Sequence, residues 1–207
     1  MTKRLTIEVV SDVVCPWCYI GKRRLEKALE LAKGELEVEV RWLPFQLNAD
    51  MPPAGMARAD YRKAKFGSIE RGRELDARVA GEGNGEGISF AFERMQRTPN
   101  TVAAHRLIEL AQKQGRGGAV VDALFKAYFE DAEDIGERSV LDRIAGAAGV
   151  EGWPEAADEK QVAALEASLR GLGISAVPTF IFDRKFGVSG AHPPEALVSA
   201  MREAAAS

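Results

Sequence analysis

The sequence predicts an α/β fold interrupted by a large all-helical segment. Residues 5–10 and 36–43 alternate apolar and polar side chains, as strands do, and a helical pattern lies between them. From about residue 57 to 150 the apolar residues recur at helical spacing and no convincing strand is found. A short apolar run at 179–182 restores the strand pattern near the other end. Both ends of the chain are therefore expected to be α/β and its centre helical.

Length and composition exclude several classes of protein. At 207 residues, with 46% hydrophobic and 29% charged residues, the chain has the composition of an ordinary globular protein. Its net charge of −3 gives no electrostatic reason to expect a nucleic-acid or membrane partner, and two cysteines are too few for a disulfide-stapled secreted scaffold. Glu8 and Asp12 interrupt the first apolar segment before it reaches signal-peptide length. We therefore expect a cytoplasmic protein.

The first 44 residues are expected to form a strand, a turn, a helix and a second strand. Pro16 presets a helical φ angle at a first-turn position, and apolar residues then recur every three or four positions until Gly34. Residues 36–43 resume the alternating pattern, which Pro44 ends. This opening is a βαβ unit.

Glycines and capping residues predict the elements of the remaining chain. Five helices are expected in order along it, over residues 61–79, 98–115, 119–130, 139–149 and 155–172. Thr98 is expected to cap the second of these, with Pro99 as its first helical residue, and the four glycines of 81–87 to form a loop.

The C-terminal end is expected to be a hairpin followed by a helix. Residues 179–182 and 186–189 are the predicted hairpin strands, and Pro193-Pro194 opens the helix to about residue 206. We therefore divide the chain into a discontinuous domain, residues 1–50 and 153–207, and an inserted helical domain, residues 51–152.

The motif Cys15-Pro16-Trp17-Cys18 carries the strongest functional signal. A thiolate attacks disulfides, and the unpaired N–H groups at the start of a helix stabilise the thiolate form of Cys15. Cys18, one turn later, can close a disulfide with Cys15 or resolve a mixed disulfide, while Pro16 and Trp17 tune the potential. A structural zinc site would need four ligands, and the only further histidines, His105 and His192, lack paired spacing, so we expect no metal.

Several segments together carry a resemblance to a known family. They are Ser-Asp-Val-Val-Cys-Pro-Trp-Cys-Tyr-Ile-Gly at 11–21, Val-Pro-Thr-Phe at 177–180, Arg-Thr-Pro-Asn-Thr at 97–101, Ala-His-Arg-Leu at 104–107 and Val-Ser-Gly-Ala at 188–191. The chain resembles the DsbA family of thioredoxin-fold oxidoreductases, most closely its FrnE-like branch of cytoplasmic proteins. The likeness covers nearly the whole chain.

The resemblance implies a DsbA-like thioredoxin fold with a large all-helical insertion. It implies that the Val177-Pro178 bond is cis and faces the cysteines, so that Pro178 joins Cys15 and Cys18 in the catalytic centre and the backbone of Val177 can pair with an extended substrate. The substrate-contact candidates are Val177, Thr179, Asn100, His105, Ser189 and His192. The expected partners are disulfide-containing proteins or small thiols, for a monomer or homodimer that needs no cofactor beyond its dithiol, with glutathione as a candidate co-substrate.

The chain departs from the family at one position of the first strand. Thioredoxin and secreted DsbA proteins carry a buried acid six residues before the nucleophile, whereas this chain has Val9, so the family's usual proton relay is missing there. Asp12, nearer the turn, is our candidate replacement, and His105 could act as an acid or base. Two other function classes stay open. The related 2-hydroxychromene-2-carboxylate isomerases are glutathione-dependent but usually carry a serine where this chain has Cys15, and a chaperone or zinc-binding module would be non-catalytic.

Overall fold

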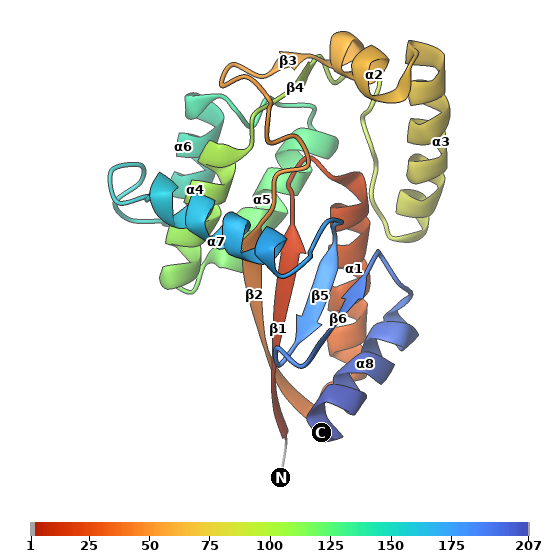
Figure 1. Cartoon of the computed structure of the whole chain (residues 1–207), viewed down its shortest axis with the longest axis vertical. Coiled ribbons are helices and arrows are strands. Elements are labelled where there is room, and N and C mark those ends of the chain that lie inside the picture. Colours follow the sequence, from red (N-terminus) through yellow and green to blue (C-terminus); the bar gives the residue numbers. More distant parts are fainter. Residues whose placement is uncertain (1–2, 207) are drawn as a thin grey trace.

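A four-stranded sheet lies at the centre of the computed structural model, which describes residues 3–206 (Figure 1). Its strands are β1 (Lys3–Ser11), β2 (Leu36–Pro44), β5 (Thr179–Phe182) and β6 (Phe186–Ser189), in the order β2-β1-β5-β6. β2 runs parallel to β1, while β5 is antiparallel to both β1 and β6. Pairing of Val10 with Thr179 brings the start of β5 to the end of β1, next to the cysteine motif.

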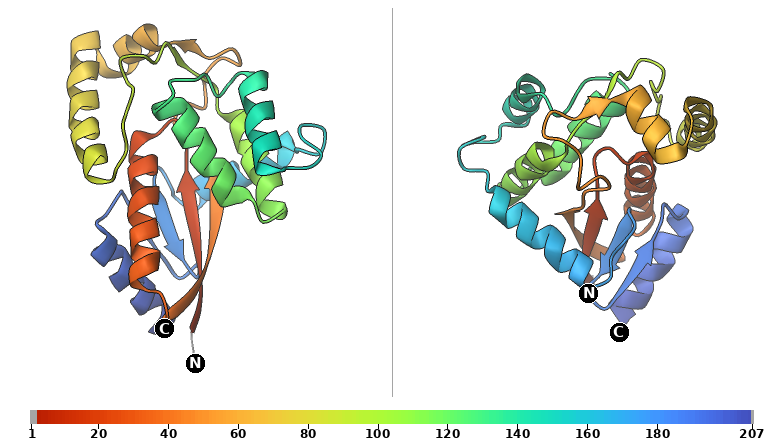
Figure 2. Two further views of the ribbon diagram at one scale, coloured as in Figure 1. Left: turned by 180° about the vertical axis from the view of Figure 1, so that it is seen from behind. Right: turned by 45° about the horizontal axis from the view of Figure 1, so that its top comes forward.

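Helices cover both faces of this sheet. α1 (Pro16–Leu31) and α8 (Pro194–Ala206) pack against each other on one face, and α7 (Glu159–Gly171) crosses the other (Figures 1 and 2). Ile7, Val9 and Phe180 lie on one face of the two central strands and are almost completely buried, while Val10 on the other face joins an apolar cluster with Leu169 of α7. The βαβ unit, the hairpin and the last helix are confirmed, and the arrangement is the expected thioredoxin fold.

The centre of the chain is mainly helical. It contains α2 (Arg58–Phe66), α3 (Ile69–Gly85), α4 (Val102–Lys113), α5 (Gly117–Phe129) and α6 (Arg138–Ala148). α4 and α5 pack against each other and against β2, whereas α2 and α3 form a separate pair beyond the start of α1 (Figures 1 and 2). Within residues 3–206, no helix combines the length and the apolar character needed to cross a membrane.

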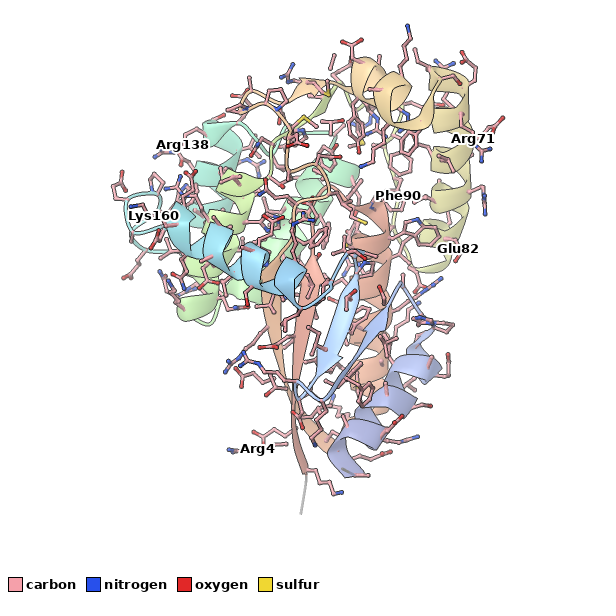
Figure 3. All side chains as sticks on the ribbon, in the orientation of Figure 1. Arg4, Arg71, Glu82, Phe90, Arg138 and Lys160 are labelled. Carbon is pink, nitrogen blue, oxygen red and sulfur yellow. The ribbon has the colours of Figure 1, made fainter. Side chains whose placement is uncertain are left out.

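The helix expected over 61–79 is two helices, and the loop expected at 81–87 is mostly helical. Gly67, with a φ of 87°, ends α2, and α3 then continues to Gly85. Phe90 lies beside α3 (Figure 3). A Cβ added at Gly83 would lie 2.3 Å from the Phe90 ring. Each glycine inside a helix lowers helix stability by about 1 kcal/mol relative to alanine. The packing of Phe90 on Gly83 favours the helix here, and the local composition gives no sign of that contact.

The expectation that Thr98 caps a helix is also wrong. Thr98 belongs to β4 (Arg97–Thr98), which pairs with β3 (Met56–Ala57) in a short antiparallel ribbon within the segment expected to lack strands. α4 starts only at Val102, after the Asn100 side chain has accepted a hydrogen bond from the Val102 N–H. Strand pairing with Met56, 42 positions earlier (98 − 56), thus overrides a local capping signal at Thr98.

The helix expected over 155–172 begins four residues later than predicted. The Asp158 side chain accepts hydrogen bonds from the N–H groups of Lys160 and Gln161, so α7 starts at Glu159. Division of the chain into two domains at residues 50 and 153 stays a prediction.

Candidate active site

Cys15 is the residue that immediately precedes α1. Its backbone is extended (φ −92°, ψ 113°), and its carbonyl accepts hydrogen bonds from the N–H groups of Cys18 and Tyr19, at 3.0 and 3.3 Å. Pro16 starts the helix because it has no N–H to satisfy, and no side chain caps the free amides of the first turn. The positive end of the helix dipole therefore lies beside Cys15.

The two cysteines differ in their surroundings. They form no disulfide, and both are buried, whereas Trp17 between them is 40% exposed. Burial raises the pKa of Cys18 well above its ordinary value, and the neighbouring Cys15 raises that pKa further, while Ser11 and the backbone of Asp12 lower it. Cys18 is therefore held as a neutral thiol, as suits a group that reacts second.

The start of β5 brings a backbone carbonyl to the nucleophile. The Val177-Pro178 peptide is cis, as the resemblance implies, and the Cys15 sulfur lies 3.8 Å from the Val177 carbonyl oxygen. The Pro178 ring packs against Gly21 of α1, where an added Cβ would lie 2.9 Å from its Cγ. Residues separated by about 160 positions thus meet, and the expected juxtaposition of Cys15, Cys18 and Pro178 is present.

Two polar residues are buried beside the cysteine motif. Asp12 accepts hydrogen bonds from the Leu47 N–H at 2.8 Å and, more weakly, from the Val14 N–H at 3.5 Å. The His105 Nε2 of α4 lies 3.4 Å from the Asp12 carboxylate and 3.2 Å from the Phe45 carbonyl. His105 is only 3% exposed, so it is placed behind the cysteines and not on an open surface.

The position of the missing acid is apolar in the fold as well. Val9 pairs with Trp42 on one side and Phe180 on the other, and it is buried in the core. Glu8 points elsewhere, because its carboxylate is bound by Arg184. Of the two acids flanking Val9, Asp12 is therefore the one that lies in the cysteine region.

The other substrate-contact candidates fall into two places. The Thr179 hydroxyl donates to the Ala176 carbonyl at 2.8 Å, so the Ser189 hydroxyl, 2.9 Å away, donates to Thr179. His192 is exposed, with its Nε2 2.9 Å from the Ser189 carbonyl. Thr179 and Ser189 therefore support the loop that carries Val177, whereas His192 contacts only its own loop.

Asn100 lies away from the Val177 loop, in the segment before α4, where its side-chain amide hydrogen-bonds to backbone groups. Its side chain donates to the Met51 carbonyl and accepts from the Val102 N–H, at 2.8 and 2.9 Å. These bonds join the loop before α4 to the segment after β2. Among the described residues, no cluster of three or more His, Cys, Asp or Glu side chains is arranged to bind a metal.

Ser11 is a residue that the sequence reasoning overlooked. It is the last residue of β1 and is buried, and its hydroxyl lowers the pKa of Cys18. The available signal was its place two residues after Val9, because alternate residues of a strand share one face of the sheet.

Comparisons with known proteins agree with this geometry. Residues 6–202 match the family model of the DSBA-like thioredoxin domain. The crystal structure of the probable DsbA oxidoreductase SCO1869 from Streptomyces coelicolor is 31% identical, with a TM-score of 0.87 over 97% of this chain and 89% of that one. The uncharacterized protein YwbO of Bacillus subtilis is 28% identical over 182 residues, which are 84% of this chain and 85% of YwbO.

A more distant likeness concerns the isomerase class. The structure of a 2-hydroxychromene-2-carboxylate isomerase covers 96% of this chain and 95% of its own, with a TM-score of 0.70. At 14% identity it shares the fold alone.

Proposed function

Because the chain belongs to the DSBA-like thioredoxin domain family, we propose that it is a thiol–disulfide oxidoreductase acting on protein or small-molecule disulfides through Cys15 and Cys18. The observation that carries this proposal is the Cys15 sulfur, placed at the start of α1 and 3.8 Å from the Val177 carbonyl. The helix start stabilises the attacking thiolate, and the exposed side chain of Trp17 offers an apolar contact beside it.

The proposed reaction has two exchange steps. The Cys15 thiolate attacks a substrate disulfide, forms a mixed disulfide, and releases one substrate sulfur, which takes a proton from solvent. Cys18 then loses its proton and attacks the Cys15 sulfur, which breaks the mixed disulfide and releases the second substrate thiol. The substrate gains two electrons and the protein ends with a Cys15–Cys18 disulfide, so each step balances.

The loop before β5 is the proposed substrate contact. Val177 is partly buried, and its carbonyl faces Cys15, so an extended segment of substrate beside it would present its sulfur to the nucleophile. Thr179 and Ser189 support this loop through their hydroxyl–hydroxyl bond.

The proposed location is the cytoplasm, as in the FrnE-like branch that the sequence resembles. In a reducing compartment the dithiol form prevails, which favours reduction or isomerisation of substrates over net oxidation. Low-molecular-weight thiols such as glutathione are the proposed electron source that restores the dithiol.

The experiment is an insulin-reduction assay with dithiothreitol, paired with an assay of scrambled-disulfide refolding. We expect the wild type to accelerate both reactions and Cys15→Ser to lose both activities. Ser199→Ala, which removes an exposed hydroxyl of α8, is the matched control and should behave as wild type. Equal activity of wild type and Cys15→Ser would refute the proposal.

A further arm tests the isomerase class directly. The Cys18→Ala variant is incubated with glutathione and 2-hydroxychromene-2-carboxylate. We expect no turnover above the uncatalysed rate, and efficient turnover would instead assign the chain to the isomerases.

A further inference from the structure

The resolving cysteine has no direct contact with bulk water. Cys18 must lose a proton before it attacks and regain one when it leaves, yet only 1% of its surface is exposed. The neighbouring strand position, Val9, offers no polar atom. Because burial raises the pKa of Cys18, spontaneous ionisation of its thiol at neutral pH is unfavourable. The second exchange step therefore needs a proton acceptor inside the protein.

Ser11 is the side chain that can reach this thiol. Its hydroxyl lowers the pKa of Cys18, yet the Oγ atom is buried without a hydrogen bond of ordinary geometry to any residue of the described chain. A buried hydroxyl without a hydrogen-bond partner is destabilising, which sets Ser11 apart from the paired polar groups around it.

A small cavity connects Ser11 to α4. It measures about 10 Å³, which is close to the room that one water molecule needs. Ser11, His105 and Glu109 are its polar side chains, and Trp42 and Val121 are among the apolar ones. The unpartnered hydroxyl and the imidazole thus share one partly enclosed space.

His105 has the hydrogen-bond arrangement of a base. The Phe45 carbonyl only accepts hydrogen bonds, so the Nε2 atom 3.2 Å away carries the proton of neutral His105 and the Nδ1 atom is left as the acceptor. Asp12, 3.4 Å from Nε2, stabilises the imidazolium that forms when Nδ1 takes a proton. A base oriented by a buried carboxylate is therefore present behind the cysteines.

We propose that Ser11 and the His105–Asp12 pair form the proton pathway of Cys18, with Ser11 as the relay and His105 as the proton store. During resolution the Cys18 proton passes to the Ser11 hydroxyl, whose own proton moves through a water in the cavity to the Nδ1 atom of His105. The Cys18 thiolate then attacks Cys15, and the departing substrate thiolate takes its proton from solvent. His105 returns its proton to solvent or, in the reverse direction, to Cys18. This inference rests on the proposed function.

Titratable side chains from β1, α4 and α5 surround this pathway. Asp12 of the β1 end and Glu109 of α4 lie beside His105, and Cys15 lies beside Cys18. Tyr128 of α5 interacts electrostatically with Asp12, but burial raises the pKa of its phenol, so it stays neutral. Burial raises the pKa of Glu109, while Lys113 lowers it.

The test separates the two exchange steps. The reduced protein is mixed in a stopped-flow instrument with one equivalent of 5,5′-dithiobis(2-nitrobenzoate), whose thiolate product absorbs visible light. The first released thiolate reports the attack by Cys15, and the second reports the attack by Cys18 on the mixed disulfide. Cys18→Ser should show the first phase alone.

We expect Ser11→Ala and His105→Gln to slow the second phase at pH 7 by about tenfold or more, which is the low end for general base catalysis. The first phase should be unchanged. Since hydroxide replaces the internal base at high pH, the difference from wild type should shrink steadily between pH 7 and pH 10. Ser11→Thr keeps the hydroxyl and should keep the second phase within about twofold of wild type.

Two results would overturn the inference. One is a second phase of wild-type rate in both variants at pH 7. The other is a slowing that is the same at every pH, which marks a structural effect. Circular dichroism confirms that each variant is folded, and His105→Gln can still donate to the Phe45 carbonyl. Absence of a fast first phase in the wild type would instead refute the proposed function itself.

Discussion

Replacement of Gly21 by alanine tests the packing of α1 against the Pro178 loop. Gly21 lies inside α1, and a Cβ there would lie 2.9 Å from the Pro178 Cγ and 3.3 Å from the Phe180 ring. Both neighbours are ring atoms of buried or packed residues, which cannot swing aside as the end of a long side chain can. Either the helix or the loop has to move by several tenths of an ångström.

The magnitude follows from two opposing contributions. Alanine is favoured over glycine inside a helix by about 1 kcal/mol, whereas forcing an extra methyl group into a packed core costs about 1–3 kcal/mol. The net expectation is a loss of up to about 2 kcal/mol in the free energy of unfolding, or a fall of several degrees in Tm for a chain of this size. The matched control is Gly146→Ala in α6, where a Cβ meets nothing within 4 Å, so stability should rise by up to about 1 kcal/mol.

The assay is urea unfolding followed by circular dichroism, together with insulin reduction. We expect Gly21→Ala to lie about 1–3 kcal/mol below Gly146→Ala in free energy of unfolding. We also expect it to reduce insulin more slowly, because the displaced loop lengthens the distance between the Cys15 sulfur and the Val177 carbonyl. If Gly21→Ala gained as much stability as Gly146→Ala, the tight packing of Pro178 on α1 would be refuted.

Two further predictions concern pH. Burial alone would raise the pKa of Glu166, but hydrogen bonds from Gln46 and Arg170 lower it overall. The ionised Glu166 therefore contributes fully to folding stability above the unfolded pKa of about 4.3, and this contribution is lost as the pH falls through the lower folded pKa. Glu166→Gln should therefore cost about 1–2 kcal/mol at pH 7 and less at pH 3, measured by urea unfolding; a pH-independent loss would contradict this. Burial raises the pKa of Glu109. Protonated Glu109 therefore contributes to folding stability below the unfolded pKa, and that contribution is lost as the pH rises through the higher folded pKa. Glu109→Gln should raise Tm at pH 7 and match wild type at pH 4, and an equal Tm at pH 7 would contradict the assignment.

Local sequence signals predicted the parts of the fold that depend on neighbours in the chain. Alternation at 5–10 and 36–43 gave β1 and β2, and Pro16 after Cys15 placed the nucleophile at the start of α1. The hairpin strands at 179–182 and 186–189 match the structure at both ends. These elements are set by side-chain alternation, proline geometry and turn residues, all of which act within a few positions.

Errors arose where distant segments decide the local conformation. Thr98 has the features of a helix cap but pairs with Met56, and the glycines near the end of α3 lie in a helix because Phe90 packs on Gly83. The salt bridges of Glu86 with Arg24 and Lys27 further join this end of α3 to α1. Such contacts outweigh propensities of about 1 kcal/mol per residue.

A dithiol at the start of a helix in an α/β fold can be predicted for this protein from local residue patterns. The chemistry of Cys15 and Cys18 follows from their spacing and from the free amides of the first helical turn. The surroundings of that dithiol depend on contacts between distant segments, which no local pattern reveals. The Val177 carbonyl lies in the loop before β5, Ser11 ends β1, Asp12 follows it, and His105 belongs to α4. These groups meet because strand pairing and core packing bring those elements together.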